Sequence, residues 1–424
     1  MPRPREPRQA LIYAELLPNI RQVSVGCSLP SPSTPDTEAT VSPDGLTLRV
    51  KHDGVETSIR LPGPVAPSQQ LPVRHPGTAA LSWRFPLARS WGHKALLPVP
   101  EEPSIPWSAS DVRPESPIAC RACRAVIVSA GRLKAWKNLP SENWAEMMEF
   151  WHCHKPHHHR HGHGHDEAGL ASKGYSASSR ISAQPGVGFI DISSFLVSES
   201  DIFPSSITKA LLFPSSDGTV GHDEMVQNNE LHKLQDGKTG IFCASCESIL
   251  GVLNDEISVS IFKWGVCMYE HDQQSPRPTL SHCISAMLLA TMAQSGCSKS
   301  IIMPMETWNR PRSKDAQPEP LLNIWVFNRN IAFSSTEEPC NLAIPAVKVL
   351  YRMISASEAD KLLDSMTSDV QDITLPTSIA GALLEHLTRS NGYLPHSDRL
   401  FREWTVGLLE KWDGGGEQEL SDCG

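Results

Sequence analysis

The sequence predicts a β-rich α+β protein, in which an N-terminal β region and a mixed α/β body are joined by a zinc site of two Cys-x-x-Cys pairs. Three observations lead to this class. Twenty of the 35 prolines lie in the first 120 residues, where they favour short strands between irregular loops. Helical and strand patterns interleave in the last third of the chain, as in α+β proteins. Two Cys-x-x-Cys pairs, separated by 119 residues, offer four metal ligands.

The N-terminal region, residues 1–117, contains alternating apolar patterns that are typical of strands. Residues 23–27 alternate with period two, and residues 78–86 form a further strand candidate. Residues 46–61 predict a hairpin, because Asp53 and Gly54 supply the turn with positive φ angles. We therefore expect a β region, and a sandwich is one arrangement that it favours.

The central region, residues 118–255, begins at the first cysteine pair and ends just after the second. The β-branched run 125–128 follows the first pair directly and predicts a turn that leads into a strand. A helix is expected to start at Ser141, a natural N-cap, and to run toward a His-rich insertion at 157–166. Short strands at 188–192 and 194–197, then a polar loop at 217–240, are expected before the second pair.

The C-terminal region, residues 256–412, has the most regular patterns, and residues 413–424 read as a flexible tail. Strands are expected at 257–269, 321–333 and 347–354, and helices at 281–293 and 379–387, the second ending at the Asn391-Gly392 stop. The pattern at 400–412 fits a helix or a strand, and periodicity leaves both open.

Composition and charge exclude several classes of protein. A net charge of −9 over 424 residues disfavours binding of nucleic acid through bulk positive charge. The longest nearly apolar run, residues 283–293, is too short to cross a bilayer, and the N-terminus lacks the apolar segment of a secretory signal. We therefore expect no membrane association and a cytoplasmic or nuclear location, where the eleven cysteines stay reduced.

The two cysteine pairs are the strongest chemical signal in the chain. We expect Cys120, Cys123, Cys243 and Cys246 to hold one structural zinc ion, because two Cys-x-x-Cys turns together supply a tetrahedral set of thiolates. Arg121 and Arg124 are expected to lower the thiolate pKa values. Two alternatives stay open: a redox-active dithiol, which the strand-like run after Cys123 disfavours, and four unrelated buried cysteines.

A second metal site is a weaker possibility at the end of the helix predicted after Ser141. His152, Cys153 and His154 are all of zinc-binding types, and alternate residues of an extended segment point the same way. The alternative is that Cys153 only anchors the end of the helix. Eight of the 17 histidines fall within residues 152–165, and those from His157 onward form a solvated tract without a specific ligand pattern.

No nucleotide-binding loop, Ser-His-Asp triad, HExxH helix or paired carboxylate motif is present, so catalysis must be sought among the cysteines. A thiol that carries an acyl group as a thioester needs to be exposed and activated. Cys153, Cys267, Cys283 and Cys340 are candidates, although each is better explained as a core residue.

Several motifs, taken in order, resemble one family. These are Cys120-Arg-Ala-Cys123, residues 139–144 (LPSENW), residues 151–156 (WHCHKP), residues 243–251 (CASCESILG), and the C-terminal segments 391–395 (NGYLP) and 404–409 (WTVGLL). The set resembles the HECT-like ubiquitin ligases that bind a ubiquitin-conjugating enzyme. The resemblance covers residues 118–412 in scattered motifs.

The resemblance implies a protein that engages a charged ubiquitin-conjugating enzyme and promotes transfer of ubiquitin to a protein substrate. It also implies a link to the nuclear machinery that processes the 3′ ends of messenger RNA. The family's metal pattern carries over to the four paired cysteines, but no catalytic residue does, and Cys423 in the Gly/Glu-rich tail is a poor nucleophile. Whether the chain is an enzyme therefore stays open; the alternative is a zinc-stabilised scaffold or adaptor without catalysis.

Overall fold

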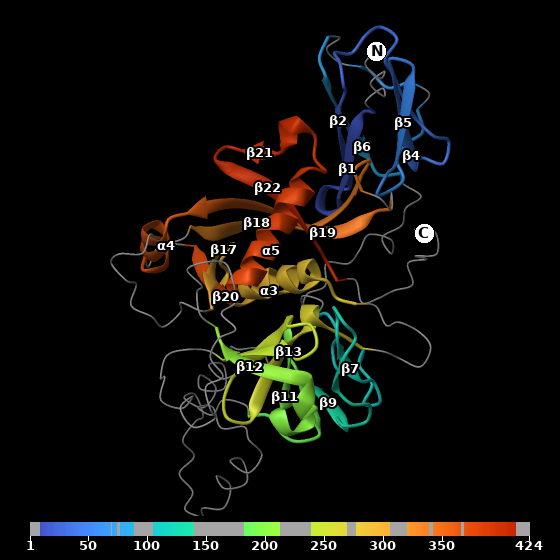
Figure 1. Ribbon diagram of the computed structural model, residues 1–424. Coiled ribbons are helices and arrows are strands. Elements are labelled where there is room, and N and C mark those ends of the chain that lie inside the picture. The colour runs from blue at the N-terminus through green and yellow to red at the C-terminus, as the bar shows by residue number, and fades with distance from the viewer. Residues whose placement is uncertain are drawn as a thin grey trace, which may run out of the picture. The chain divides into compact units, whose positions relative to one another are not determined.

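The computed structural model describes residues 9–68, 70–73, 77–88, 105–139, 182–212, 239–268, 277–305, 320–338, 342–365 and 369–412 (Figure 1). Its contacts divide the chain into two units. Unit 1 combines residues 1–104 with residues 280–424, and unit 2 consists of residues 105–279. Unit 2 is therefore an insertion between two parts of the chain that fold together.

A nine-stranded sheet forms the centre of unit 1. Its main path has the order β21-β22-β19-β18-β1-β2-β6, and β17 pairs with both β18 and β20. The strands are β1 (Leu11–Leu17), β2 (Gln22–Ser28), β6 (Ala80–Pro86), β17 (Lys299–Pro304), β18 (Leu321–Ser335), β19 (Ile344–Ile354), β20 (Val370–Leu375), β21 (Leu400–Phe401) and β22 (Trp404–Glu410). All pairs are antiparallel except β17 with β20.

A second layer of unit 1 is the three-stranded sheet of β3 (Glu38–Val41), β4 (Thr47–His52) and β5 (Val55–Arg60). The β4–β5 turn is formed by Asp53 and Gly54, with φ angles of 50° and 80°, as the Asp-Gly pattern predicts. Side chains of this sheet share one hydrophobic core with β1, β2 and β6. The N-terminal part of the chain therefore packs sheet against sheet.

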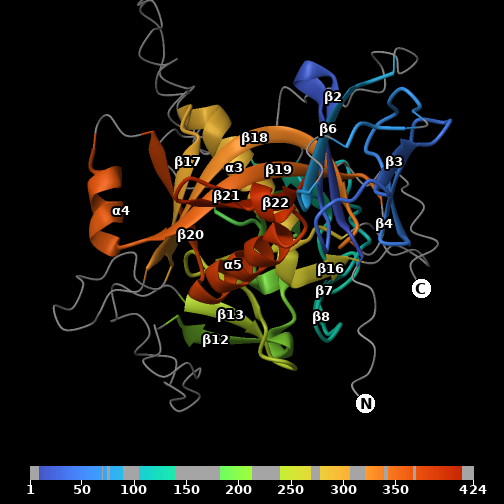
Figure 2. The ribbon, with the colours of Figure 1, turned by 90° about the horizontal axis from the view of Figure 1, so that it is seen from above.

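The described part of unit 1 contains the helices α3 (Leu280–Ser295), α4 (Ala356–Leu363) and α5 (Thr377–Asn391). α5 packs against β22 (Figure 2) so closely that a Cβ at Gly407 would lie 2.8 Å from the Leu387 side chain. α3 is fastened to β22 by Ser285 Oγ, which donates to the Glu410 carbonyl at 2.8 Å. None of the helices among the described residues is long and apolar enough to span a membrane.

The described strands of unit 2 form two sheets. The larger has the strand order β12-β13-β14-β15-β11-β10-β9, and the smaller has the order β16-β7-β8. The strands are β7 (Ile118–Cys120), β8 (Val126–Val128), β9 (Ala135–Asn138), β10 (Val187–Ile190), β11 (Ser194–Ser198), β12 (Ile207–Leu211), β13 (Thr239–Cys243), β14 (Ile249–Leu253), β15 (Ser258–Phe262) and β16 (Val266–Met268). Short 3₁₀ helices connect them, including η2 (Glu199–Asp201), η3 (Pro204–Ser206) and η5 (Lys263–Gly265); unit 1 contains η1 (Pro18–Ile20) and η6 (His396–Asp398).

The β-rich class is confirmed, and so are most of the predicted elements. The confirmed elements are the strands at 23–27, 78–86, 125–128, 188–192, 194–197, 321–333 and 347–354, the hairpin at 46–61 and the helices at 281–293 and 379–387. The ambiguous stretch 400–412 contains the strands β21 and β22. The helix predicted from Ser141, most of the loop 217–240 and the tail 413–424 lie outside the described residues.

The single strand predicted at 257–269 is wrong. The chain leaves the larger sheet after Phe262, turns through η5 and joins the smaller sheet as β16. The turn is fixed by Lys263, which is fully buried and donates through Nζ to the carbonyls of Pro106, Asp191 and Ile192. Because a buried ammonium needs several acceptors, the chain turns where these carbonyls meet.

The two units of the structure do not coincide with the three consecutive regions predicted at 1–117, 118–255 and 256–412. The first and last regions share one sheet, since β1 pairs with β18 and places Tyr13 opposite Ser335. The boundaries fall at 104/105 and 279/280, so unit 2 includes the strands β15 and β16.

Candidate metal centre

The first cysteine pair lies on the turn between β7 and β8. The Cys120 N–H donates to the Ala125 carbonyl at 2.8 Å, and the Arg124 N–H donates to the Cys120 carbonyl at 2.9 Å. Arg124 adopts a left-handed conformation with φ of 67°. These bonds close a tight loop in which Cys120 and Cys123 are held three residues apart.

The second cysteine pair forms the same turn between β13 and β14. The Cys243 N–H donates to the Ser248 carbonyl at 2.9 Å, the Glu247 N–H donates to the Cys243 carbonyl at 2.8 Å, and Glu247 has φ of 61°. Both turns thus have the same two hydrogen bonds and the same left-handed residue at the same spacing. The repeated Cys-x-x-Cys pattern in the sequence is a repeated structural unit.

The segment that contains η3 links the two hairpins. The Phe203 N–H donates to the Ile127 carbonyl of β8 at 2.8 Å. Three residues later, the Ser206 carbonyl accepts a hydrogen bond from the Ala244 N–H, inside the second cysteine turn, at 2.9 Å. One short segment therefore sets the position of the second hairpin relative to the first.

The turn through η5 links the hairpins a second time. The Gly265 carbonyl accepts a hydrogen bond from the Arg121 N–H at 3.0 Å, inside the first cysteine turn. On its other side, a Cβ at Gly265 would lie 3.1 Å from the Ile249 carbonyl oxygen of β14. The close approach favours glycine at this position, and the backbone alone brings the two turns together.

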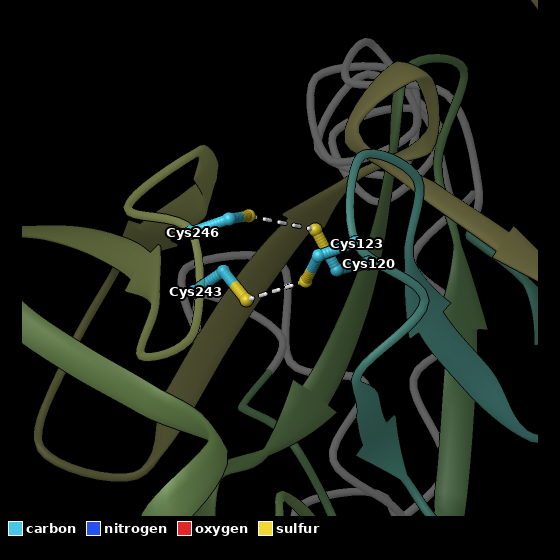
Figure 3. Close-up of side chains that lie close together, drawn as sticks. All are labelled: Cys120, Cys123, Cys243 and Cys246. Carbon is cyan, nitrogen blue, oxygen red and sulfur yellow. Dashed lines mark hydrogen bonds between the residues drawn. The ribbon is translucent and has the colours of Figure 1, made fainter.

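The four thiols of Cys120, Cys123, Cys243 and Cys246 point toward one another (Figure 3), and their sulfur atoms all lie within 4.8 Å. The Cys120 and Cys246 sulfurs are 3.6 Å apart, and those of Cys123 and Cys243 are 3.5 Å apart. These distances exclude disulfides, which need about 2.05 Å. A tetrahedron with metal–sulfur bonds of about 2.3 Å has edges of about 3.8 Å. The arrangement therefore fits a tetrahedral metal ion.

The four thiols differ in burial, and the pKa values of Cys120 and Cys246 are shifted in opposite directions. Cys120 and Cys243 are fully buried, Cys246 is half-buried and Cys123 is exposed. Burial raises the pKa of Cys120 to about 12, whereas hydrogen bonding from the Ser248 side chain and backbone lowers the pKa of Cys246 to about 6. The Cys246 thiol therefore loses its proton more readily than the Cys120 thiol, which releases its proton when a metal binds.

Arg121 and Arg124 were expected to lower the thiolate pKa values, but their side chains make other contacts. The Arg124 guanidinium donates to Cys267 Sγ at 3.3 Å, and Arg121 Nε donates to the Val266 carbonyl at 3.4 Å. Both side chains therefore fasten β16 to the first hairpin. The hydrogen bonds that lower the pKa of Cys246 come from Ser248, which the sequence reasoning missed. The sequence signal that could have identified Ser248 is its position, a hydroxyl residue two places after Cys246.

The remaining candidate residues fall into two groups. Cys267 and Cys283 are buried, and Cys267 Sγ contacts the Ala119 carbonyl at 3.6 Å, so both are core residues. Four predicted positions lie outside the described residues, together with the histidine tract: His152, Cys153, His154 and Cys340. Cys423 also lies outside them.

The comparisons with known proteins cover almost the whole chain. The sequence model of the HECT-like ubiquitin-conjugating enzyme (E2)-binding family matches residues 15–406. A human protein named as an E3 ubiquitin-protein ligase is 22% identical over 311 residues, which cover 69% of this chain and 72% of the relative. Its bovine counterpart is 22% identical over 393 residues, covering 87% and 90%.

An uncharacterized protein of Schizosaccharomyces pombe is 23% identical over 327 residues, which cover 74% of this chain and 79% of the relative. No solved structure matches the chain. The family match begins in β1 and ends in β22, so it includes both cysteine hairpins and most of both units. The resemblance inferred from the ordered motifs is thereby confirmed, and the chain belongs to the HECT-like ubiquitin-conjugating enzyme (E2)-binding family.

Proposed function

We propose that this protein binds a ubiquitin-conjugating enzyme charged with ubiquitin and promotes transfer of the ubiquitin to protein substrates. The observation that carries the proposal is the family match over residues 15–406. The relatives named as E3 ubiquitin-protein ligases support it, because the human one aligns over about two thirds of each chain and the bovine one over more. The partners are then the conjugating enzyme, ubiquitin and the substrate.

Zinc is the metal that best fits the four-cysteine cluster. Thiolate ligands select zinc or iron–sulfur clusters, and a set of four thiolates with no space for a further ligand is typical of structural zinc. We propose that Cys120, Cys123, Cys243 and Cys246 hold one zinc ion that joins the β7–β8 and β13–β14 hairpins. The metal would stabilise unit 2 and take no part in the transfer.

The described cysteines favour transfer directly from the conjugating enzyme over a thioester on this chain. A thiol that accepts ubiquitin must be exposed and activated. Cys27, Cys267 and Cys283 are buried, burial raises the pKa of Cys27 to about 12, and Cys297 is half-buried. Outside the metal cluster, the described cysteines are buried except for the half-buried Cys297.

The test is a discharge assay with purified full-length protein, activating enzyme and a panel of charged conjugating enzymes. We expect faster loss of the charged form of at least one conjugating enzyme, without a reducible adduct of ubiquitin on this chain. Absence of acceleration with every conjugating enzyme would refute the proposed function. A reducible adduct would support catalysis but refute the direct route.

A non-catalytic scaffold is the second candidate, and it is favoured by the burial of Cys27, Cys267 and Cys283. Such a protein would assemble or stabilise a partner complex, for instance in the processing of messenger RNA 3′ ends. It would leave the discharge rates unchanged and lose partner binding when Cys120 or Cys243 is replaced by serine. Single substitutions of the scattered cysteines would leave that binding intact.

A further inference from the structure

An exposed group of apolar side chains lies on the nine-stranded sheet of unit 1. Phe327 of β18 is 49% exposed, and Leu400 and Phe401 of β21 are 65% and 40% exposed. We call these residues, together with Trp325 and Trp404, the aromatic patch. Single exposed apolar residues are common, but three large ones that cluster usually mark a binding surface.

Ring contacts join the patch across several strands. The ring centroids of Trp325 and Phe327 are 5.8 Å apart, those of Trp325 and Trp404 are 5.9 Å apart, and those of Phe327 and Phe401 are 5.8 Å apart. Trp404 is buried and forms the base, while Phe327 and Phe401 reach solvent. The four rings are therefore one continuous apolar cluster, and Leu400 is the strand neighbour of Phe401.

The backbone of β18 is irregular where it carries Phe327. The register with β19 passes from Val326 opposite Val349 directly to Asn328 opposite Lys348, so Phe327 is the extra residue of a β-bulge. A bulge redirects a side chain at the expense of regular pairing and is often found at functional sites. This irregularity helps to present Phe327 to solvent.

Cationic groups lie over the rings. Lys299 Nζ is 5.4 Å from the centre of Trp325, the Arg352 guanidinium is 4.9 Å from Trp404, and the Arg402 guanidinium is 5.6 Å from Phe401. Arg352 pairs with Glu358 at 2.8 Å, but Lys299 and Arg402 form no ion pair with an acidic group among the described residues. Arg352 Nε is also buried without a hydrogen-bond partner among those residues. The patch thus combines apolar rings with uncompensated positive charge.

We propose that the aromatic patch docks a protein segment in which acidic residues flank an aliphatic or aromatic residue. The apolar residue would lie against Phe327, Leu400 and Phe401, and the acidic groups would meet Lys299 and Arg402. This charge complementarity favours an acidic segment, and Trp and Arg at the centre are typical of protein-binding hot spots. The proposal adds a docking site to the proposed function and does not depend on it.

A nucleic acid fits the patch less well than a peptide. Bases bind by stacking on exposed ring faces. Here cations already cover a face of Trp325, Trp404 and Phe401, and the most exposed member, Leu400, has no ring. Fewer ring faces are therefore free for bases to stack on, and an aliphatic side chain is the most exposed member, which suits a protein partner.

The test selects short random displayed peptides on the full-length protein. The same selection is run on the double variant Phe327→Ser and Phe401→Ser, on Arg402→Glu, and on the control Phe203→Ser. Phe203 is 56% exposed and is not one of the patch residues, so its substitution changes a matched exposed phenylalanine without altering the patch. All substituted side chains are exposed, so folding should be preserved, and a thermal melt checks it.

We expect the wild type and Phe203→Ser to enrich peptides in which Asp or Glu flanks Leu or Phe. Their affinity should fall about tenfold or more in the double variant and in Arg402→Glu, as for hot-spot residues, and should weaken with added salt. The proposal is overturned if no peptide is enriched, if neutral or basic peptides are, or if the double variant binds equally well. Stronger binding of single-stranded oligouridylate, lost in the double variant, would instead identify a nucleic-acid surface.

Discussion

Replacing Cys243 by serine removes one of the four sulfur ligands with little change in shape. Cys243 is fully buried and its sulfur lies 3.5 Å from that of Cys123. A serine hydroxyl keeps its proton at neutral pH and is a poor zinc ligand, so we expect the purified variant to contain no zinc. The backbone hydrogen bonds of the hairpin do not involve the side chain and should persist.

The magnitude follows from how the hairpins are held. Structural zinc sites in small peptides bind with about 10–16 kcal/mol, and those peptides are unfolded without metal. Here η3 and η5 already link the two hairpins, so we expect unit 2 to stay folded without zinc. The metal then adds stability only by mass action, about 4 kcal/mol when free zinc is about 1,000-fold above Kd. For a unit of this size, that loss lowers Tm by about 8–16 °C.

The assay combines zinc content by mass spectrometry with thermal melting by circular dichroism, with and without a strong chelator. Wild type should hold one zinc ion per chain and melt lower with the chelator, and Cys243→Ser should match the chelated wild type. Cys297→Ser, a half-buried cysteine of unit 1, is the control and should keep both the zinc and the wild-type melt. A Cys243→Ser variant that retains full zinc content, or a wild type indifferent to chelation, would refute the reasoning.

Three further outcomes follow from the packing. Gly251→Ala should destabilise unit 2 by about 1–3 kcal/mol in urea unfolding, because a Cβ there would collide with the backbone of β15. Gly381→Ala is the control: a Cβ at this position in α5 meets nothing within 4 Å, and the substitution should stabilise unit 1 by about 0.5–1 kcal/mol. Lys348→Met should cost about 3 kcal/mol in urea unfolding, because it leaves the Glu15 carboxylate buried without its cation. Burial lowers the pKa of His386 below its usual 6.5, so the unfolded chain binds the proton more tightly than the folded chain does. The free energy of unfolding should therefore fall as the pH drops below 6.5. The variant His386→Gln should flatten this part of a profile of urea midpoint against pH, and an unchanged profile would contradict the prediction.

The elements that the sequence predicted well are those whose determining contacts are local. Asp-Gly favours the positive φ angles that Asp53 and Gly54 adopt, so the β4–β5 hairpin could be identified from its turn. Each Cys-x-x-Cys turn is closed by hydrogen bonds within six residues, so the turn into a strand after Cys123 was also accessible. In both cases the partner atoms are neighbours in sequence.

The elements that it missed depend on distant partners. Residues 257–269 look like one apolar strand, yet the chain turns at Lys263, whose acceptors lie 71 to 157 residues away. The pairing of Tyr13 with Ser335 joins the two ends of the chain and has no local signature. At the metal centre, the cysteines could be named from their spacing and Ser248 from its place two residues after Cys246, but Gly265 accepts a hydrogen bond from Arg121, a contact that only the folded chain creates.

The geometry of the cluster also orders metal binding and folding. In a zinc finger the ligands are close in sequence and the metal can organise an unfolded chain. Here 119 residues separate the two turns, and their distance is set by Phe203, Ser206 and Gly265. The unfolded chain must close this long loop before the second pair contributes, which costs entropy that the native hydrogen bonds offset. High-affinity zinc binding should therefore appear only after β8, η3 and η5 are in place, so zinc uptake is a late event in folding. The number of zinc ions bound per chain then directly measures the fraction of chains in which unit 2 is correctly folded.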